Sequence, residues 1–157
     1  YRNRTRIGQL PGKVKSVECN NEWRTTGKFV ADAGGSLLFV DRRANLVEHK
    51  WADIMAGNFN TFSIVSTGVS DFALHGSKPV ILKTDKNLVL ENGHSVNLAT
   101  FDSEKTWCTV EVAGSRVLVR GDLNNKGKLI VLNKEGVLRG QTDFDLHHNG
   151  YSQGTRS

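Results

Sequence analysis

A five-residue motif late in the sequence matches a pattern that carries serine-hydrolase chemistry, Gly150-Tyr151-Ser152-Gln153-Gly154. In hydrolases the G-x-S-x-G motif lies between a strand and a helix, and this strained turn presents the serine hydroxyl beside oxyanion donors. The residues around Ser152 have neither the alternation of a strand nor the periodicity of a helix. We therefore interpret the match as coincidental and predict that the chain is not an enzyme.

Two other groups of residues resemble metal-ligand motifs. His147 and His148 are adjacent, and neighbouring side chains of a strand point to opposite faces, so the pair is poorly placed to chelate one ion. The segment 122–127 opens like a calcium loop, but lysine and isoleucine stand at the later ligand positions. The sequence therefore predicts a plain turn at 122–127, no metal site and no cofactor.

The composition is that of a globular protein with a basic surface. The 157 residues include 21 Lys and Arg against 16 Asp and Glu, which gives a net charge of +5. The length corresponds to one domain, and no apolar run is long enough to span a membrane. A positive charge of this size favours an acidic partner, and we expect no membrane insertion.

The chain contains two cysteines, Cys19 and Cys108. Small secreted domains usually carry more cysteines, at the spacings of a disulfide framework. We therefore expect two half-buried free thiols in an intracellular, cytoplasmic protein, with one disulfide as the alternative.

Apolar and polar residues alternate along most of the chain, as they do in half-buried β-strands. Asn92-Gly93 is a typical hairpin turn, and only 46–56 could wind into a short helix. We predict an all-β domain over residues 14–146, with a flexible basic lead-in at 1–13 and a tail at 147–157. The strands are expected at 14–19, 28–32, 36–40, 62–66, 72–74, 80–83, 87–90, 94–99, 106–112, 116–120, 128–132 and 137–139.

A sequence pattern that consists of an apolar strand, a polar turn and a second apolar strand occurs three times. Aligned on Leu37, Leu88 and Leu129, its copies are 51 and 41 residues apart. Repeats of this length indicate the architecture of a fold. Two all-β folds are built from units of about four strands. These are the β-trefoil, which has three units, and the β-propeller, in which closed rings have four or more blades.

The stretch from Trp107 to Gly140 resembles one repeat of the fascin-type β-trefoils. An aromatic-led strand (Trp107-Cys108-Thr109-Val110) precedes Val117-Leu118-Val119-Arg120, and then Gly127-Lys128-Leu129-Ile130 leads to a turn glycine. Residues 72–107 are similar, although leucines stand where that family has a tyrosine. This resemblance implies a β-trefoil of three four-stranded repeats and a filament of the actin type, or another protein assembly, as partner. A β-propeller or a fragment of one is the alternative fold.

Basic residues cluster around the turns of the repeats, and a threefold fold would bring equivalent turns toward one end. Trp51 follows a basic pair and is the best candidate for an exposed stacking surface, whereas Trp107 is expected in the core. The predicted binding residues are Arg42, Arg43, Lys50, Trp51, Lys83, Lys86, Lys126 and Lys128.

These observations predict a non-enzymatic binding or scaffolding module. Its basic loops would contact an acidic macromolecular surface, a protein assembly or an acidic filament. Recognition of a polyanion, either sulfated glycan or nucleic acid, is one alternative, and steep salt dependence would mark it. A propeller-type assembly platform within a larger complex is the other alternative.

Overall fold

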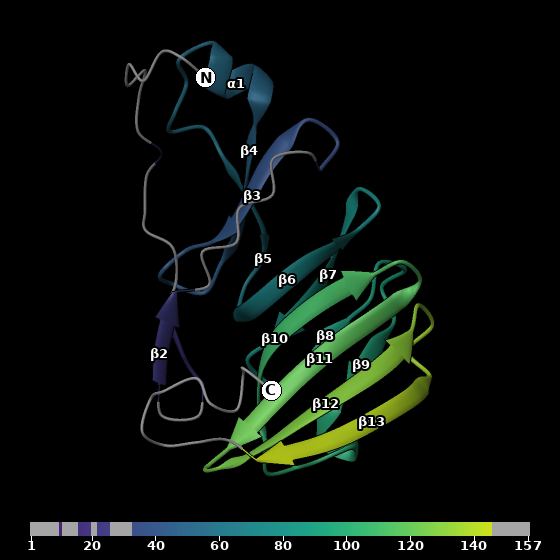
Figure 1. Cartoon of the computed structure of the whole chain (residues 1–157). Coiled ribbons are helices and arrows are strands. Elements are labelled where there is room, and N and C mark those ends of the chain that lie inside the picture. Colours follow the sequence, from purple (N-terminus) through teal and green to yellow (C-terminus); the bar gives the residue numbers. More distant parts are fainter. Residues whose placement is uncertain (1–9, 11–15, 20–21, 26–32, 146–157) are drawn as a thin grey trace, which may run out of the picture.

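The computed structural model describes residue 10 and residues 16–19, 22–25 and 33–145. The regular secondary structure of the described residues is almost entirely β, as predicted (Figure 1). Its strands are β1 (Ser16–Cys19), β2 (Glu22–Thr25), β3 (Ser36–Val40), β4 (Leu46–Lys50), β5 (Ser63–Ser66), β6 (Val69–His75), β7 (Lys78–Lys83), β8 (Asn87–Val89), β9 (Ser95–Asn97), β10 (Thr106–Ala113), β11 (Arg116–Leu123), β12 (Lys126–Asn133) and β13 (Leu138–Asp145). One short helix, α1 (Trp51–Met55), and one 3-10 turn, η1 (Leu98–Thr100), interrupt them.

The strands form antiparallel sheets in which neighbours in sequence are neighbours in space. We call β3-β4-β5 the first sheet, β6-β7-β8-β9 the second sheet and β10-β11-β12-β13 the third sheet. A separate hairpin joins β1 to β2. Figure 1 shows the second and third sheets lying against each other, with the first sheet beyond β6.

The second sheet is covered on both faces. Phe72 and Ile81 pack with Leu38, Val40 and Leu46 of the first sheet in one apolar cluster. The opposite face contributes to a larger cluster with the third sheet, whose buried members are Ala73, Val80, Leu82, Leu88, Leu90, Val96, Leu98, Trp107, Val110, Val117, Val119, Ile130 and Leu132. Strands buried on two faces carry consecutive apolar residues, which explains the run from Val80 to Leu82.

The structural repeat is offset by one strand from the repeat that the sequence predicts. Leu46, Leu88 and Ile130 are each fully buried in a strand that one further strand follows in its sheet. Forty-two residues separate each of them from the next. An alignment on Leu37 and Leu129 puts β3 where β4 belongs, because both strands of that hairpin are apolar.

The predicted β-trefoil is not supported. A trefoil shares the strands of its repeats in one barrel, whereas here each four-stranded unit closes its own sheet from consecutive strands. The sheets then stack face to face, which is the arrangement of propeller blades. Repeat length does not separate these two folds, because both use units of about four strands.

Other predictions are corrected in detail. The segment 46–56, the one place where the sequence allowed a short helix, is strand β4 followed by the single turn of α1. Strand β2 has no counterpart among the predicted strands, and the predicted strand at 28–32 lies outside the described residues. Apart from residue 10, so do the lead-in at 1–13 and the tail at 147–157. Cys108 is disulfide-bonded, so the expectation of free thiols is wrong for this residue.

Candidate functional site

The turn between β3 and β4 carries the Arg42-Arg43 pair. The carboxylate of Asp41 closes this turn, because its Oδ1 accepts the backbone N–H groups of Arg43 and Asn45, each at 2.9 Å. Ala44 takes a left-handed φ of 65° within the turn. Both arginine side chains are exposed as a result.

The corresponding turns of the other two sheets have the same backbone feature. Lys86 lies between β7 and β8 with a φ of 69°, and Asn124 lies between β11 and β12 with a φ of 54°. Together with Ala44 they are all the residues other than glycine that have a positive φ in the described part of the chain. Left-handed backbone is unfavourable for residues with a Cβ atom, so the three turns are held by their surroundings.

Hydrogen bonds connect these turns along one end of the sheets. The Ala44 carbonyl accepts the N–H of Val69 at 2.7 Å, and the adjacent Gly68 carbonyl accepts the N–H of Thr84 at 2.8 Å. Farther along, the ammonium of Lys86 donates to the Ser103 carbonyl at 2.6 Å. We call this end of the molecule the turn face. The turns of the first and second sheets therefore lie at one end of the molecule, although the sequence-based expectation derived such an arrangement from a threefold fold that the structure does not have.

Most of the predicted lysines on the turn face already form hydrogen bonds or ion pairs with other groups of the chain. Lys83 donates to the Ser66 hydroxyl at 2.9 Å and to the carbonyl of Thr67. Lys86 is tied to Ser103. These ammonium groups fasten one turn to the next, which the sequence could not indicate because the acceptors are hydroxyl and carbonyl oxygens.

Lys126 and Lys128 lie in a pocket of about 410 Å³ at the β11–β12 end of the turn face. The Nζ of Lys126 lies 2.7 Å from Asp145, and that of Lys128 lies 2.9 Å from Asp143. The hydrogen bond that Lys126 donates to the Asp145 carboxylate raises the pKa of Lys126. The pocket lining also includes Asp102, Lys105, Gly127 and Phe144, so its three ammonium and three carboxylate groups balance.

Sequence reasoning missed Asp102 and Lys105 as part of this pocket. They form an ion pair of 3.2 Å three residues apart. Burial opposes ionisation of Asp102, but hydrogen bonds from the Glu104 backbone and from Lys105 outweigh it and lower the pKa of Asp102. Their spacing of three residues could have indicated this ion pair from the sequence. It could not have shown that the pair lines the same pocket as Lys126.

Arg42 and Arg43 differ from the lysines of the turn face. Neither guanidinium forms an ion pair among the described residues, and both side chains are exposed. Lys50, at the end of β4, is also exposed, but it lies at the opposite end of that strand from the β3–β4 turn. The structure thus brings most of the predicted basic turns to one face. On this face, Arg42 and Arg43 are the predicted binding residues whose positive charge is exposed and has no ion-pair partner among the described residues.

The structure places Trp107 in the core and Trp51 at the surface, as predicted. Trp107 is buried in the core between the second and third sheets, and its indole N–H donates to the Asp102 carbonyl at 3.3 Å. Trp51 begins α1 and is 36% exposed. It follows Lys50, at the end of β4 that lies away from the β3–β4 turn.

The motifs with catalytic or metal-binding patterns add no site to the described chain. The segment 122–127 consists of the end of β11, a two-residue turn at 124–125 and the start of β12, and Asp122 is paired to Arg120 at 3.0 Å. Within residues 33–145 and the two short N-terminal strands, no group of three or more potential ligands could hold a metal ion. The Ser152 motif and the pair His147-His148 lie outside the described residues. None of the described helices is long and apolar enough to cross a membrane.

Comparisons with known proteins give similarity at the level of the fold. No protein-family model and no curated protein sequence matches the chain. Among solved structures, the N-terminal domain of Nup159, a β-propeller, is similar with a TM-score of 0.53 and 12% identity. A structure of S. cerevisiae Dbp5 L327V bound to Nup159, Gle1 H337R, IP6 and ADP is similar with a TM-score of 0.50 and 12% identity. Each similarity covers 74% of this chain and 38% of the solved chain, so this chain spans well under half the length of its structural neighbour.

Proposed function

We propose that this chain is a non-enzymatic, propeller-type platform for protein assembly that binds an acidic protein surface through Arg42 and Arg43. The observation that carries the proposal is the pairing pattern on the turn face. Its lysines are occupied by internal acceptors, whereas the two arginines are exposed without an ion pair among the described residues.

Arginine suits this role because its planar guanidinium binds a carboxylate with two parallel hydrogen bonds. The Asp41 carboxylate holds the turn through backbone N–H groups. The backbone that presents the arginines is therefore ordered before a partner arrives, which reduces the entropy cost of binding.

The structural comparison supports a platform rather than an enzyme. The solved complex that contains Nup159 also contains Dbp5 and Gle1, so the similar fold occurs there in a protein assembly. A balanced pocket at Lys126 and Lys128 offers little attraction to a polyanion, because each ammonium already faces a carboxylate. A protein surface with a few carboxylates therefore fits better than a long polyanion.

Binding to three defined probes tests the proposal. The probes are a poly-glutamate peptide, filamentous actin and heparin, measured across a salt series with the wild type and with Arg42→Glu/Arg43→Glu. We expect the peptide or the filament to bind and the double reversal to lose at least tenfold in affinity. Lys134→Glu/Arg139→Glu is the matched control, since it makes the same charge change at exposed positions of the β12–β13 hairpin.

Two results would overturn the proposal. One is equal binding by the wild type and the arginine reversal. The other is tight binding to heparin together with no binding to the acidic peptide or to actin, which would assign the turn face to polyanions.

A further inference from the structure

The charged pocket at the β11–β12 end of the third sheet lies on the face that this sheet turns toward the second sheet. Residues two apart on a strand share a face, so Lys126 and Lys128 lie on the same face of β12 as Ile130, which is buried in the cluster between the two sheets. Their ladder partners in β13, Asp145 and Asp143, share that face. The pocket therefore continues the layer between the two sheets beyond the end of its apolar core.

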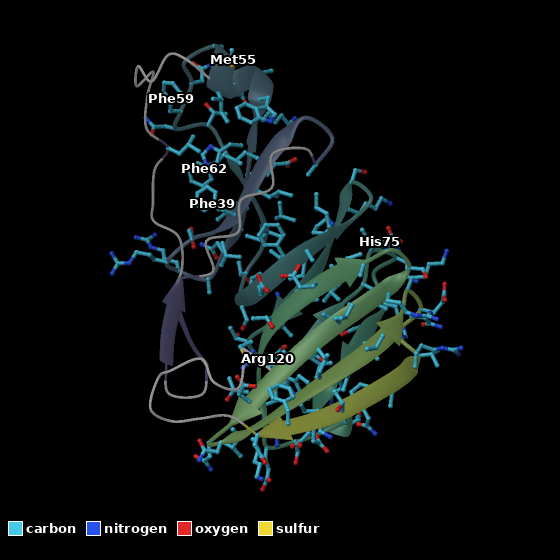
Figure 2. The ribbon with its side chains drawn as sticks, viewed as in Figure 1. Phe39, Met55, Phe59, Phe62, His75 and Arg120 are labelled. Carbon is cyan, nitrogen blue, oxygen red and sulfur yellow. The ribbon has the colours of Figure 1, made fainter. Side chains whose placement is uncertain are left out.

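The opposite face of the third sheet carries a different pair of side chains. Figure 2 shows Arg120 on the side of this sheet that is turned away from the second sheet. The guanidinium of Arg120 lies over the ring of Phe144, 5.2 Å from its centroid. Side chains alternate along a strand, so the carboxylates of Asp143 and Asp145, on either side of Phe144, point to the other face and toward the pocket.

Positive charge is in excess in the inner part of the pocket. The side chains of Lys105 and Lys128 are each 12% exposed, and Asp102, at 20%, is the one carboxylate of similar depth in the described lining. Burial opposes ionisation of Asp102, and the charge of Lys128 is one of the influences that nevertheless lower its pKa. An ammonium has three N–H donors, so the single ion pair of each lysine among the described residues leaves donors for a ligand oxygen.

Negative charge is in excess at the mouth of the pocket, which we define by Asp143 and Asp145. These side chains are 73% and 77% exposed, and the one exposed ammonium beside them belongs to Lys126. Ion pairs this exposed contribute little free energy, so a ligand can replace them. The pocket is thus positive inside and negative at its mouth, although its charges balance as a whole.

We propose that this pocket binds an ω-amino acid, a zwitterion whose carboxylate contacts Lys105 and Lys128 and whose ammonium contacts Asp145 at the mouth. Positions 128 and 145 are one ladder step of two residues apart, which is about 7 Å along the strands. The two charged groups of 6-aminohexanoate are separated by a chain of similar length. A simple anion would have to pass the carboxylates of the mouth, and a simple cation would meet the inner ammonium groups. The volume of about 410 Å³ lies in the range of small-molecule sites.

Titration of the full chain, followed by NMR at low salt and pH 7, tests this proposal. The amide signal of Gly127 reports on the lining, and the indole signal of Trp107 reports on Asp102, whose carbonyl accepts that N–H at 3.3 Å. We expect 6-aminohexanoate to shift both signals with a Kd of about 1–10 mM, because so small a ligand makes few contacts. Hexanoate and hexylammonium should bind at least fivefold more weakly. The indole signal of Trp51, in α1, should not move.

Two variants separate the inner and outer charges. Lys128→Met should weaken 6-aminohexanoate at least tenfold, whereas Lys78→Met, the same change at an exposed position of β7, should bind as the wild type does. Asp143→Asn/Asp145→Asn should weaken 6-aminohexanoate but strengthen hexanoate, an opposite response that misfolding does not produce. The proposal is overturned if about 50 mM 6-aminohexanoate shifts neither signal, if hexanoate binds the wild type equally well, or if Lys128→Met leaves the affinity unchanged.

Discussion

The carboxylate of Asp71 in β6 accepts the backbone N–H of Val110 in β10 at 2.9 Å. Both residues are buried, and the hydrogen bond joins the first strand of the second sheet to the first strand of the third sheet. A side chain thus supplies a connection between sheets that no backbone ladder provides.

Asp71→Ala should destabilise the fold by about 2 kcal/mol, because it leaves the buried N–H of Val110 without this acceptor. Urea unfolding followed by tryptophan fluorescence measures the change. Asp71→Asn retains an acceptor oxygen and should cost less. Asp143→Ala is the control at an exposed carboxylate, and a loss as large as that of Asp71→Ala would contradict the assignment.

Gly121→Ala should destabilise the third sheet by about 1–3 kcal/mol through overpacking. A Cβ atom at position 121 would lie 2.7 and 2.9 Å from two ring carbons of Trp107, which is itself held in the core. Gly140→Ala in the same sheet is the control, since nothing lies within 4 Å of the added atom. Thermal unfolding of both variants should show a lower Tm for Gly121→Ala alone.

His49 should make stability depend on pH near neutrality. The side chain is buried between Phe39 and Phe62, and neither ring nitrogen makes a hydrogen bond of normal geometry to a protein group. Burial lowers the pKa of His49, and the nearby Thr61 backbone offsets only part of that effect. The unfolded chain therefore binds a proton near pH 6.5 that the folded chain does not bind.

The sign of this effect is fixed by the direction of the pKa shift. The free energy of unfolding should be highest above pH 6.5 and should fall as the pH drops toward the lowered pKa of the folded state, by at most about 1.4 kcal/mol per pH unit. Denaturation of the wild type and of His49→Phe between pH 7.5 and 5.5 measures it. His49→Phe should flatten the dependence, whereas the exposed-site variant His94→Gln should keep it.

The strands were predictable because their apolar and polar residues alternate and their turns contain glycine or asparagine. The predicted strand at 36–40 is β3 without change, and the predicted strand at 106–112 is β10 to within one residue. The choice of architecture was not predictable in this way. Trefoils and propellers use the same local unit, and they differ in which sheet each strand joins.

The candidate site was predictable only as a set of positive charges near turns. The pairing of Lys128 with Asp143 depends on the register of β12 against β13, which sequence spacing does not determine. The fastening of Lys83 and Lys86 to carbonyl groups depends on contacts between different sheets. Arg42 and Arg43 therefore differ from the lysines because the lysines have partners within the chain. These partnerships exist only in the folded chain, so the sequence does not show them.

The central position of the second sheet determines which parts of the molecule can unfold locally. This sheet contributes to both apolar clusters, so its loss would remove the packing surface of each neighbour. Loss of the first sheet would leave the larger cluster intact. Amide hydrogen exchange should accordingly be slowest in β7 and β10, and the first sheet should exchange through a partial opening of lower free energy that leaves the rest of the chain folded.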